Sequence, residues 1–146
     1  MSTAMTRGER EAFLAETHVG LVAVADPDGG PLVVPVWYEY TPREGIRFAT
    51  GGTSRKATLL RAAGRAGFCV QTESPPYRYV SVEGPVSIGA WDYGRDVRDM
   101  ALRYLGSERG TAFLDSFASE IDATEQILFT ITPERWRTVD YSKIGL

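Results

Sequence analysis

The stretch FATGGTSRK, residues 48–56, joins the end of an apolar segment to the start of a helix. Residues 46–50 are typical of a strand, the glycine pair lets a ligand approach the backbone, and Ser54 is a favoured N-cap for a helix that runs to about residue 63. A helix N-terminus presents unpaired amides and a partial positive charge, and Arg55 and Lys56 add two full charges. Together these groups predict a phosphate site. The plain alternative is a solvated loop in front of a surface helix.

The residues before this stretch predict antiparallel strands. Residues 19–25 form a valine-rich apolar run, and residues 32–40 form a second one after a turn that contains Pro27 and two glycines. Pro35 lacks an amide donor, which predicts an edge or a bulge in the second strand. Two strand–turn–strand units within residues 19–50 favour an antiparallel meander.

The residues after this stretch add strands on both sides of a helical segment. We expect strands at 68–72, 78–88, 126–132 and 136–141, with a bulge at Gly84 and Pro85. Helices are expected from a capping box at Thr6 to about residue 17, at 92–105 up to Gly106, and at 108–117. The alternating aspartates and arginines of residues 92–103 are typical of a solvated helix face. Six or seven short strands predict a mainly β, α+β fold, a small antiparallel barrel whose closure removes exposed edges.

Composition excludes several classes of protein. The 146-residue chain has a net charge of -3, one cysteine and one histidine, so it has no internal disulfide, and no metal site is predicted. Cys69 is expected in the core and His18 at a strand start, and no catalytic side chain stands out. The negative charge disfavours a nucleic-acid partner, and no apolar run is long enough for a membrane. A polar N-terminus and the absence of a linker favour a cytoplasmic protein with one domain over residues 1–146.

Four ordered segments resemble the pyridoxamine 5'-phosphate oxidase-like split β-barrel superfamily, which includes FMN enzymes and flavin/deazaflavin oxidoreductases. They are VGLVAVADPDG (19–29), VPVWYEY (34–40), IRFATGGTSRKATLLRAAGRAGF (46–68) and YRYVSVEGPV (77–86). The resemblance implies a split β-barrel with Greek-key-type connectivity. It also implies a homodimer whose cofactor site is shared between the subunits.

The resemblance further implies roles for particular residues. Thr50, Ser54, Arg55 and Lys56 would bind the cofactor phosphate. The strand Val34, Pro35, Val36 and Trp37 would lie along the ring system, with backbone groups at the pyrimidine edge. Tyr79 stands where the oxidase has a glutamine that contacts the flavin. Trp37 packing on a ring has a plain alternative, ordinary aromatic packing. Residues 75–79 rim either a substrate pocket or a rigid surface turn.

Departures from the oxidase pattern narrow the activity. The oxidase has an arginine and a lysine where this chain has Val34 and Glu39, and the Glu39 carboxylate would repel a phosphorylated substrate. The oxidase's C-terminal segment is not recognisable in residues 136–146. We therefore expect not pyridoxamine phosphate oxidation but an oxidoreductase that uses FMN or coenzyme F420 and passes a hydride to a small unsaturated or quinone-like acceptor. The alternative is a non-catalytic flavin- or tetrapyrrole-binding protein for storage, sensing or sequestration.

Overall fold

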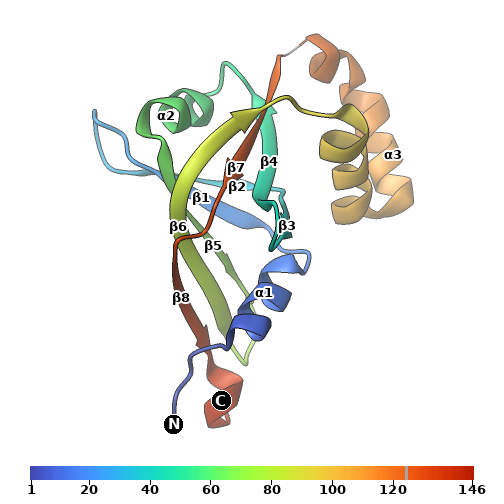
Figure 1. Ribbon diagram of the computed structural model, residues 1–146. Helices are drawn as coiled ribbons and strands as arrows, with labels where there is room; N and C mark the ends of the chain where they lie inside the picture. The colour runs from blue at the N-terminus through green and yellow to red at the C-terminus, as the bar shows by residue number, and fades with distance from the viewer. Residues whose placement is uncertain (124) are drawn as a thin grey trace.

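A curled antiparallel sheet forms the body of the molecule (Figure 1). The computed structural model describes residues 1–123 and 125–146. Seven strands follow one hydrogen-bonded path in the order β2-β1-β5-β6-β7-β4-β3, and β8 pairs with β6. The helices and strands are α1 (Arg7–Ala15), β1 (Gly20–Val24), β2 (Leu32–Val36), β3 (Glu39–Thr41), β4 (Gly45–Gly51), α2 (Arg55–Ala63), β5 (Arg65–Gln71), β6 (Arg78–Gly89), η1 (Tyr93–Asp99), α3 (Met100–Ala123), β7 (Gln126–Ile131), β8 (Arg135–Asp140) and η2 (Tyr141–Ile144).

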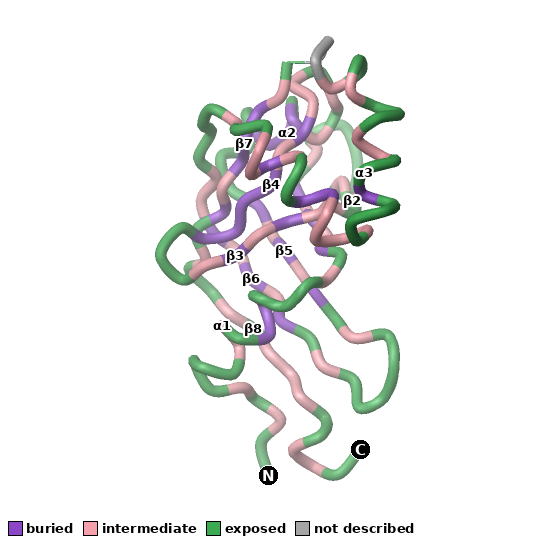
Figure 2. The backbone as a smooth tube through the Cα atoms, turned by 90° about the vertical axis from the view of Figure 1, so that its right-hand side faces the viewer, coloured by how far each residue is buried: buried purple, intermediate pink, exposed green. Residues whose placement is uncertain are grey.

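The core fills the concave side of this sheet. Alternate residues of β1, β5 and β6 are buried, and Phe48 of β4 stacks on Phe129 of β7 with ring centroids 5.8 Å apart. Helices α1 and α2 add Leu14 and Leu60, each almost fully buried. Figure 2 shows the buried stretches concentrated in the strands, while α3 is largely exposed. This arrangement confirms the predicted mainly β split barrel.

The bend that splits the barrel lies at Gly84. Strand β6 pairs with β8 up to Glu83 and with β5 up to Pro85, and from Val86 onward it pairs with β7. A Cβ atom at Gly84 would collide with the carbonyl oxygen of Thr132, so only glycine fits this corner. The irregularity predicted at Gly84 and Pro85 is therefore the point where one strand serves both halves of the sheet.

The predicted strand 32–40 and the predicted meander are wrong in one respect. The strand is broken at Trp37 and Tyr38, so β2 and β3 are separate elements at opposite ends of the sheet. The cause is burial of the Tyr38 ring, whose hydroxyl donates to the carbonyl oxygen of Leu14 at 2.6 Å, while its amide is bonded to the Tyr104 hydroxyl at 3.0 Å. Pro35 does lie on an edge strand, as predicted.

The charged helical segment is a solvated face only in part, at the exposed pair of Arg98 and Asp99. Asp96 is buried, with its carboxylate 3.2 Å from Nη1 of Arg47, and Arg95 is bonded to both Glu39 and Glu44 of the β3–β4 hairpin. The segment also begins as a π-helix, η1, before α3. Gly106 breaks α3 with φ 81 and ψ 175, as the sequence indicates. Ion pairs thus attach this helical arm to the barrel, and periodicity within the helix could not show them.

The single cysteine lies outside the core. Cys69 is not a core residue: it lies half-exposed on the convex face of β5, because the core side of this strand is taken by Ala66, Phe68 and Val70. None of the helices in the described part of the chain has an apolar stretch long enough to cross a bilayer.

Candidate functional site

The junction of β4 and α2 brings three of the predicted phosphate residues together. Thr50 is buried at the end of β4, and Nζ of Lys56 donates to its hydroxyl oxygen at 2.6 Å. Ser54 caps α2 by accepting from the amide of Ala57 at 3.2 Å. Local sequence causes this geometry, since the cap starts the helix and Gly64, with φ 68, ends it.

Lys56 is a half-buried cation without an acidic partner. Among the described residues, no carboxylate lies within 4.0 Å of its ammonium group, and the hydroxyl of Thr50 is the one side-chain acceptor that it reaches. Burial lowers the pKa of Lys56 below its ordinary value of 10.5, because desolvation disfavours the charged form. An anion placed beside the ammonium group would relieve this cost, so the arrangement fits a phosphate.

The glycine loop between them is held by a cation that the sequence reading missed. Nη1 of Arg61 donates to the carbonyl oxygen of Gly52 at 2.8 Å, and the Gly52 amide donates to the carbonyl oxygen of Glu125 at 2.7 Å. A Cβ atom at Gly52 would lie 3.1 Å from Ile127 and 3.2 Å from Arg61, so a side chain would crowd the loop. Helical periodicity could have indicated Arg61, because it follows Ser54 by two turns and lies on the same face of α2.

Arg55 is directed to a different partner. Its Nη2 donates to both oxygens of Asp26, at 2.9 and 3.0 Å, across a hollow of about 390 Å³ between α2 and the β1–β2 turn. The pKa of Asp26 is lowered mainly by the amide of Asp28 and then by this guanidinium. Arg55 therefore stands next to Lys56 in sequence, but it is paired with an acid whereas Lys56 is not.

The predicted ring-binding strand forms one wall of a groove. Pro35, Val36 and Trp37 line a hollow of about 360 Å³ together with Val19 and Phe113. Val34 instead packs against the core from the inner face of β2. Trp37 stacks on Tyr104 of α3, with centroids 5.1 Å apart and planes 9° apart, so its ring is fixed beside the groove.

Tyr79 lies far from the phosphate residues of its own chain. It is 37% exposed on the convex face of β6, opposite Gln71 and Val139. Gly89, the β6 residue in register with the end of β4 through Leu128, is ten residues further along the strand. At about 3.3 Å per residue, this is roughly 30 Å of strand. One protomer does not bring Tyr79 to Lys56.

The convex face that carries Tyr79 is poor in charge at its centre. The strand registers align Pro35, Leu21, Cys69 and Ser81 in one row across β2, β1, β5 and β6, and Val33, Ala23, Gly67 and Glu83 in the next, so that charge enters only at the β6 end of the second row. Val33 is 55% exposed. Small and apolar side chains therefore form a flat surface beside the groove at Pro35.

His18 and the acidic residues do not form a metal site. Nε2 of His18 lies 3.0 Å from the Glu16 carboxylate, and its ring packs on Phe13 with centroids 4.6 Å apart. Within residues 1–123 and 125–146, no three His, Cys, Asp or Glu side chains are grouped so that they could hold a metal ion.

Comparison with known proteins gives a family model and several relatives. The model described as Pyridoxamine 5'-phosphate oxidase matches residues 6–140. An F420H(2)-dependent biliverdin reductase of Mycobacterium tuberculosis is 35% identical over 94 residues, which is 64% of this chain and 65% of the reductase. The chain thus matches just under two thirds of that curated relative.

Solved structures share the whole fold. A conserved hypothetical protein of Mycobacterium tuberculosis superposes with a TM-score of 0.77 at 26% identity, over 99% of this chain and 91% of that chain. A structure named F420 reductase has a TM-score of 0.67 at 22% identity, over 87% of this chain and 94% of that chain. The second likeness concerns the fold alone.

Proposed function

The chain belongs to the pyridoxamine 5'-phosphate oxidase family, and on this premise we propose that it is a flavin- or deazaflavin-dependent oxidoreductase with a small unsaturated or quinone-like acceptor. The observation that carries the proposal is Lys56, a half-buried cation bonded to Thr50 and without an acidic partner among the described residues. A cofactor phosphate would complete this corner. The 35% identical biliverdin reductase, which is F420H(2)-dependent by name, favours the deazaflavin over FMN.

Different residues of the site bind different parts of the cofactor in this proposal. Lys56 and the Thr50 hydroxyl hold the phosphate, the Ser54 cap keeps the first amides of α2 aimed at it, and Arg61 fixes the Gly52 loop. The edge strand at Pro35 and Val36 lies along the ring, and Trp37 limits the groove. When bound, the reduced cofactor supplies a hydride which, with one proton from water, reduces the acceptor by two electrons. The proposal assigns no side chain as acid or base.

Pyridoxamine phosphate itself is a poor substrate in this proposal. The Glu39 carboxylate is bonded to Arg95 and lies 4.0 Å from Arg47, so this position presents an occupied ion pair rather than a free cation. A phosphorylated acceptor would gain no lysine there, and the arginine position carries Val34. The proposed acceptor therefore carries no phosphate.

We also propose that two chains share each site. Tyr79 and Lys56 are separated along β6 within one chain, and residues 23, 33, 67 and 81 form a part of the convex surface that carries small and apolar side chains and lies beside the groove at Pro35. A second copy seated on this surface would cover it and bring another Tyr79 toward the groove. Light scattering should give the mass of a dimer, and Ala23→Arg, which places a charge at the centre of the surface, should give a monomer with weakened cofactor uptake.

The experiment that tests the function is uptake of matched cofactors followed by turnover. Wild-type protein is titrated with FMN and riboflavin, and with F420 and its phosphate-free chromophore, by fluorescence. We expect one phosphorylated form to bind at least about 30-fold more tightly than its phosphate-free partner, as for a charge-assisted phosphate contact. Equal binding of both forms would contradict the phosphate site. Tight uptake of a cofactor without steady-state reduction of quinone or tetrapyrrole acceptors would contradict the proposed enzymatic activity and would indicate a cofactor-binding protein.

A further inference from the structure

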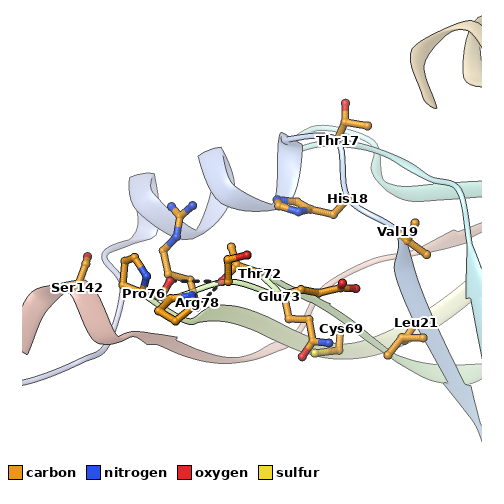
Figure 3. Close-up of a pocket in the computed structure, with 13 residues that line it drawn as sticks. Thr17, His18, Val19, Leu21, Cys69, Thr72, Glu73, Pro76, Arg78 and Ser142 are labelled. Atoms are coloured by element: carbon orange, nitrogen blue, oxygen red, sulfur yellow. Dashed lines mark hydrogen bonds between the residues drawn. The ribbon is translucent and has the colours of Figure 1, made fainter. Parts of the chain in front are cut away.

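A hollow of about 710 Å³ lies outside the phosphate corner, between the end of α1, the start of β1 and the β5–β6 hairpin (Figure 3). Its walls combine apolar groups from Val19, Leu21 and Pro76 with the polar side chains of Thr72, Glu73 and Arg78. The segment of residues 75–79, for which the sequence left a pocket rim or a surface turn open, therefore contributes to a real hollow.

Arg78 is the cation of this hollow, and its guanidinium group is not paired with an acid. The backbone amide of Arg78 donates to the Thr72 hydroxyl at 2.9 Å, which fixes its position at the start of β6. The guanidinium carbon lies 4.9 Å from the Phe13 ring centroid. Across the described residues, no carboxylate is within 4.0 Å of it and no side-chain hydrogen bond engages it. Figure 3 shows the Arg78 side chain extending from the start of β6 toward α1, while the His18 ring lies below the end of α1.

The hollow adjoins the groove at the proposed ring-binding strand. Val19, which is 55% exposed, lines both spaces. Leu21 on the floor of the hollow is directly opposite Pro35 of the groove in the β1–β2 ladder. Directly opposed residues of an antiparallel pair have Cα atoms only about 4.5–5.5 Å apart. A molecule in the hollow would therefore lie beside a ring placed along β2.

We propose that this hollow is the acceptor site and that Arg78 binds a carboxylate of the acceptor. The proposal rests on the function proposed above. A guanidinium stacked on an aromatic ring presents a fixed fork of donors that matches a carboxylate, while Val19, Leu21 and Pro76 contact the flat conjugated skeleton. The Glu73 carboxylate at the rim would repel any further negative charge on the acceptor. The acceptor is thus a conjugated organic acid whose acidic end points to α1 and whose reducible part lies toward Val19.

Two probes with one skeleton test this assignment. Biliverdin and its dimethyl ester share the conjugated skeleton and differ at the two carboxyl groups, which are charged in the acid and are neutral methyl esters in the other probe. The visible absorbance of both reports binding to the full-length protein directly, with and without cofactor. We expect wild-type protein to bind the acid about tenfold more tightly than the ester, as for a charge-assisted bidentate contact. Arg78→Gln should abolish this preference and leave ester binding unchanged, and Glu73→Gln should tighten acid binding by about twofold.

Controls separate this proposal from the cofactor assignment. Arg109→Gln, which removes an exposed arginine on α3, should keep the wild-type preference for the acid. An unchanged acid-to-ester ratio in Arg78→Gln, an equal loss in Arg109→Gln, or no binding of either probe to wild-type protein would overturn the assignment. Cofactor uptake is measured in the same samples. If the wild-type protein takes up no cofactor and Arg78→Gln still abolishes the preference for the acid, the anion site at Arg78 is supported and the proposed oxidoreductase function is contradicted.

Discussion

A cation lies beside each end of strand β4, one paired with an acid and one without an acidic partner among the described residues. Near its start, Arg47 lies 3.2 Å from the buried Asp96 carboxylate, beside Arg95, which is bonded to two glutamates. At its end, Lys56 reaches the hydroxyl of Thr50 and no acid in the described part of the chain. An ion-paired cluster therefore lies at one end of this strand and a cation without a described acidic partner at the other.

The difference separates structural charges from charges that a ligand can use. Glu44 and Glu39 raise the pKa of Arg95, and Arg95 lowers the pKa of Glu44, so Arg95 and Glu44 each stabilise the charged form of the other. Burial lowers the pKa of Lys56, so the protein destabilises its charged form. A buried ion pair holds elements together as long as both partners remain, whereas a buried lone cation costs stability that an anionic ligand restores.

The largest expected effect is at the paired end. Arg47→Met leaves Asp96 buried without its partner, and it should lower the free energy of unfolding by about 3–5 kcal/mol. Urea unfolding followed by tryptophan fluorescence measures this loss. Arg43→Met, on the same hairpin but exposed, should change the free energy of unfolding by no more than about 0.5 kcal/mol. Equal stability of the Arg47 and Arg43 variants would show that the cluster does not attach the arm.

The reverse result is expected at the unpaired end. Lys56→Met should weaken binding of the phosphorylated cofactor by about 30- to 100-fold while leaving stability equal to or above wild type. The chain has one other lysine, Lys143, whose ammonium group is 2.9 Å from the Glu9 carboxylate. Lys143→Met is the matched control and should keep cofactor affinity. A Lys56→Met protein that binds cofactor normally would remove the contrast between the two ends of β4.

Sequence reasoning succeeded where the cause is local. The capping box of Thr6 and Glu9, the N-cap at Ser54 and the left-handed Gly64 involve residues within a few positions of one another, and all three are present. The edge position of Pro35 follows from its missing amide donor. Thr50 and Lys56 also meet because only one turn and the start of a helix separate them.

The features that the sequence did not predict depend on contacts between residues far apart in the chain. Arg47 and Asp96 are 49 positions apart, and nothing in the alternating charges of the helix indicates that one aspartate is buried. The break at Trp37 and Tyr38 requires Leu14 and Tyr104, which lie in two different helices. Arg55 is directed to Asp26 by the position of the β1–β2 turn, which a motif of consecutive residues does not contain.

The lowered pKa of Lys56 gives a dependence on alkaline pH, whereas the lowered pKa of Glu44 in the paired cluster acts at acid pH. Phosphate binding needs the protonated amine, so cofactor affinity should fall as the pH rises through this lowered pKa, before the ordinary value of 10.5 is reached. Stability without cofactor should change in the opposite direction. Between the two pKa values the unfolded chain binds more protons than the folded one, so stability rises with pH.

Titration of the cofactor between neutral and alkaline pH measures this fall in affinity. Lys56→Arg should remove it, since a guanidinium stays charged throughout that range. A fall of the same size in Lys56→Arg would assign the titration to the ligand or to another group.

The smallest expected effect on cofactor affinity concerns Arg55. The resemblance assigns this residue to the phosphate, whereas in the structure it is ion-paired with Asp26. This ion pair is solvent-exposed, so it is worth no more than about 1 kcal/mol, and a bound phosphate competes with it at little cost. Asp26→Asn keeps an oxygen that accepts from the Asp28 amide but removes the charge that holds the guanidinium. If Arg55 turns to the cofactor, Asp26→Asn should tighten binding by about two- to threefold. Adding Arg55→Met should cancel that gain while altering little in the wild-type background. An Asp26→Asn protein with wild-type affinity would mean that Arg55 belongs with the structural cations near the start of β4, and that Lys56 binds the phosphate without it.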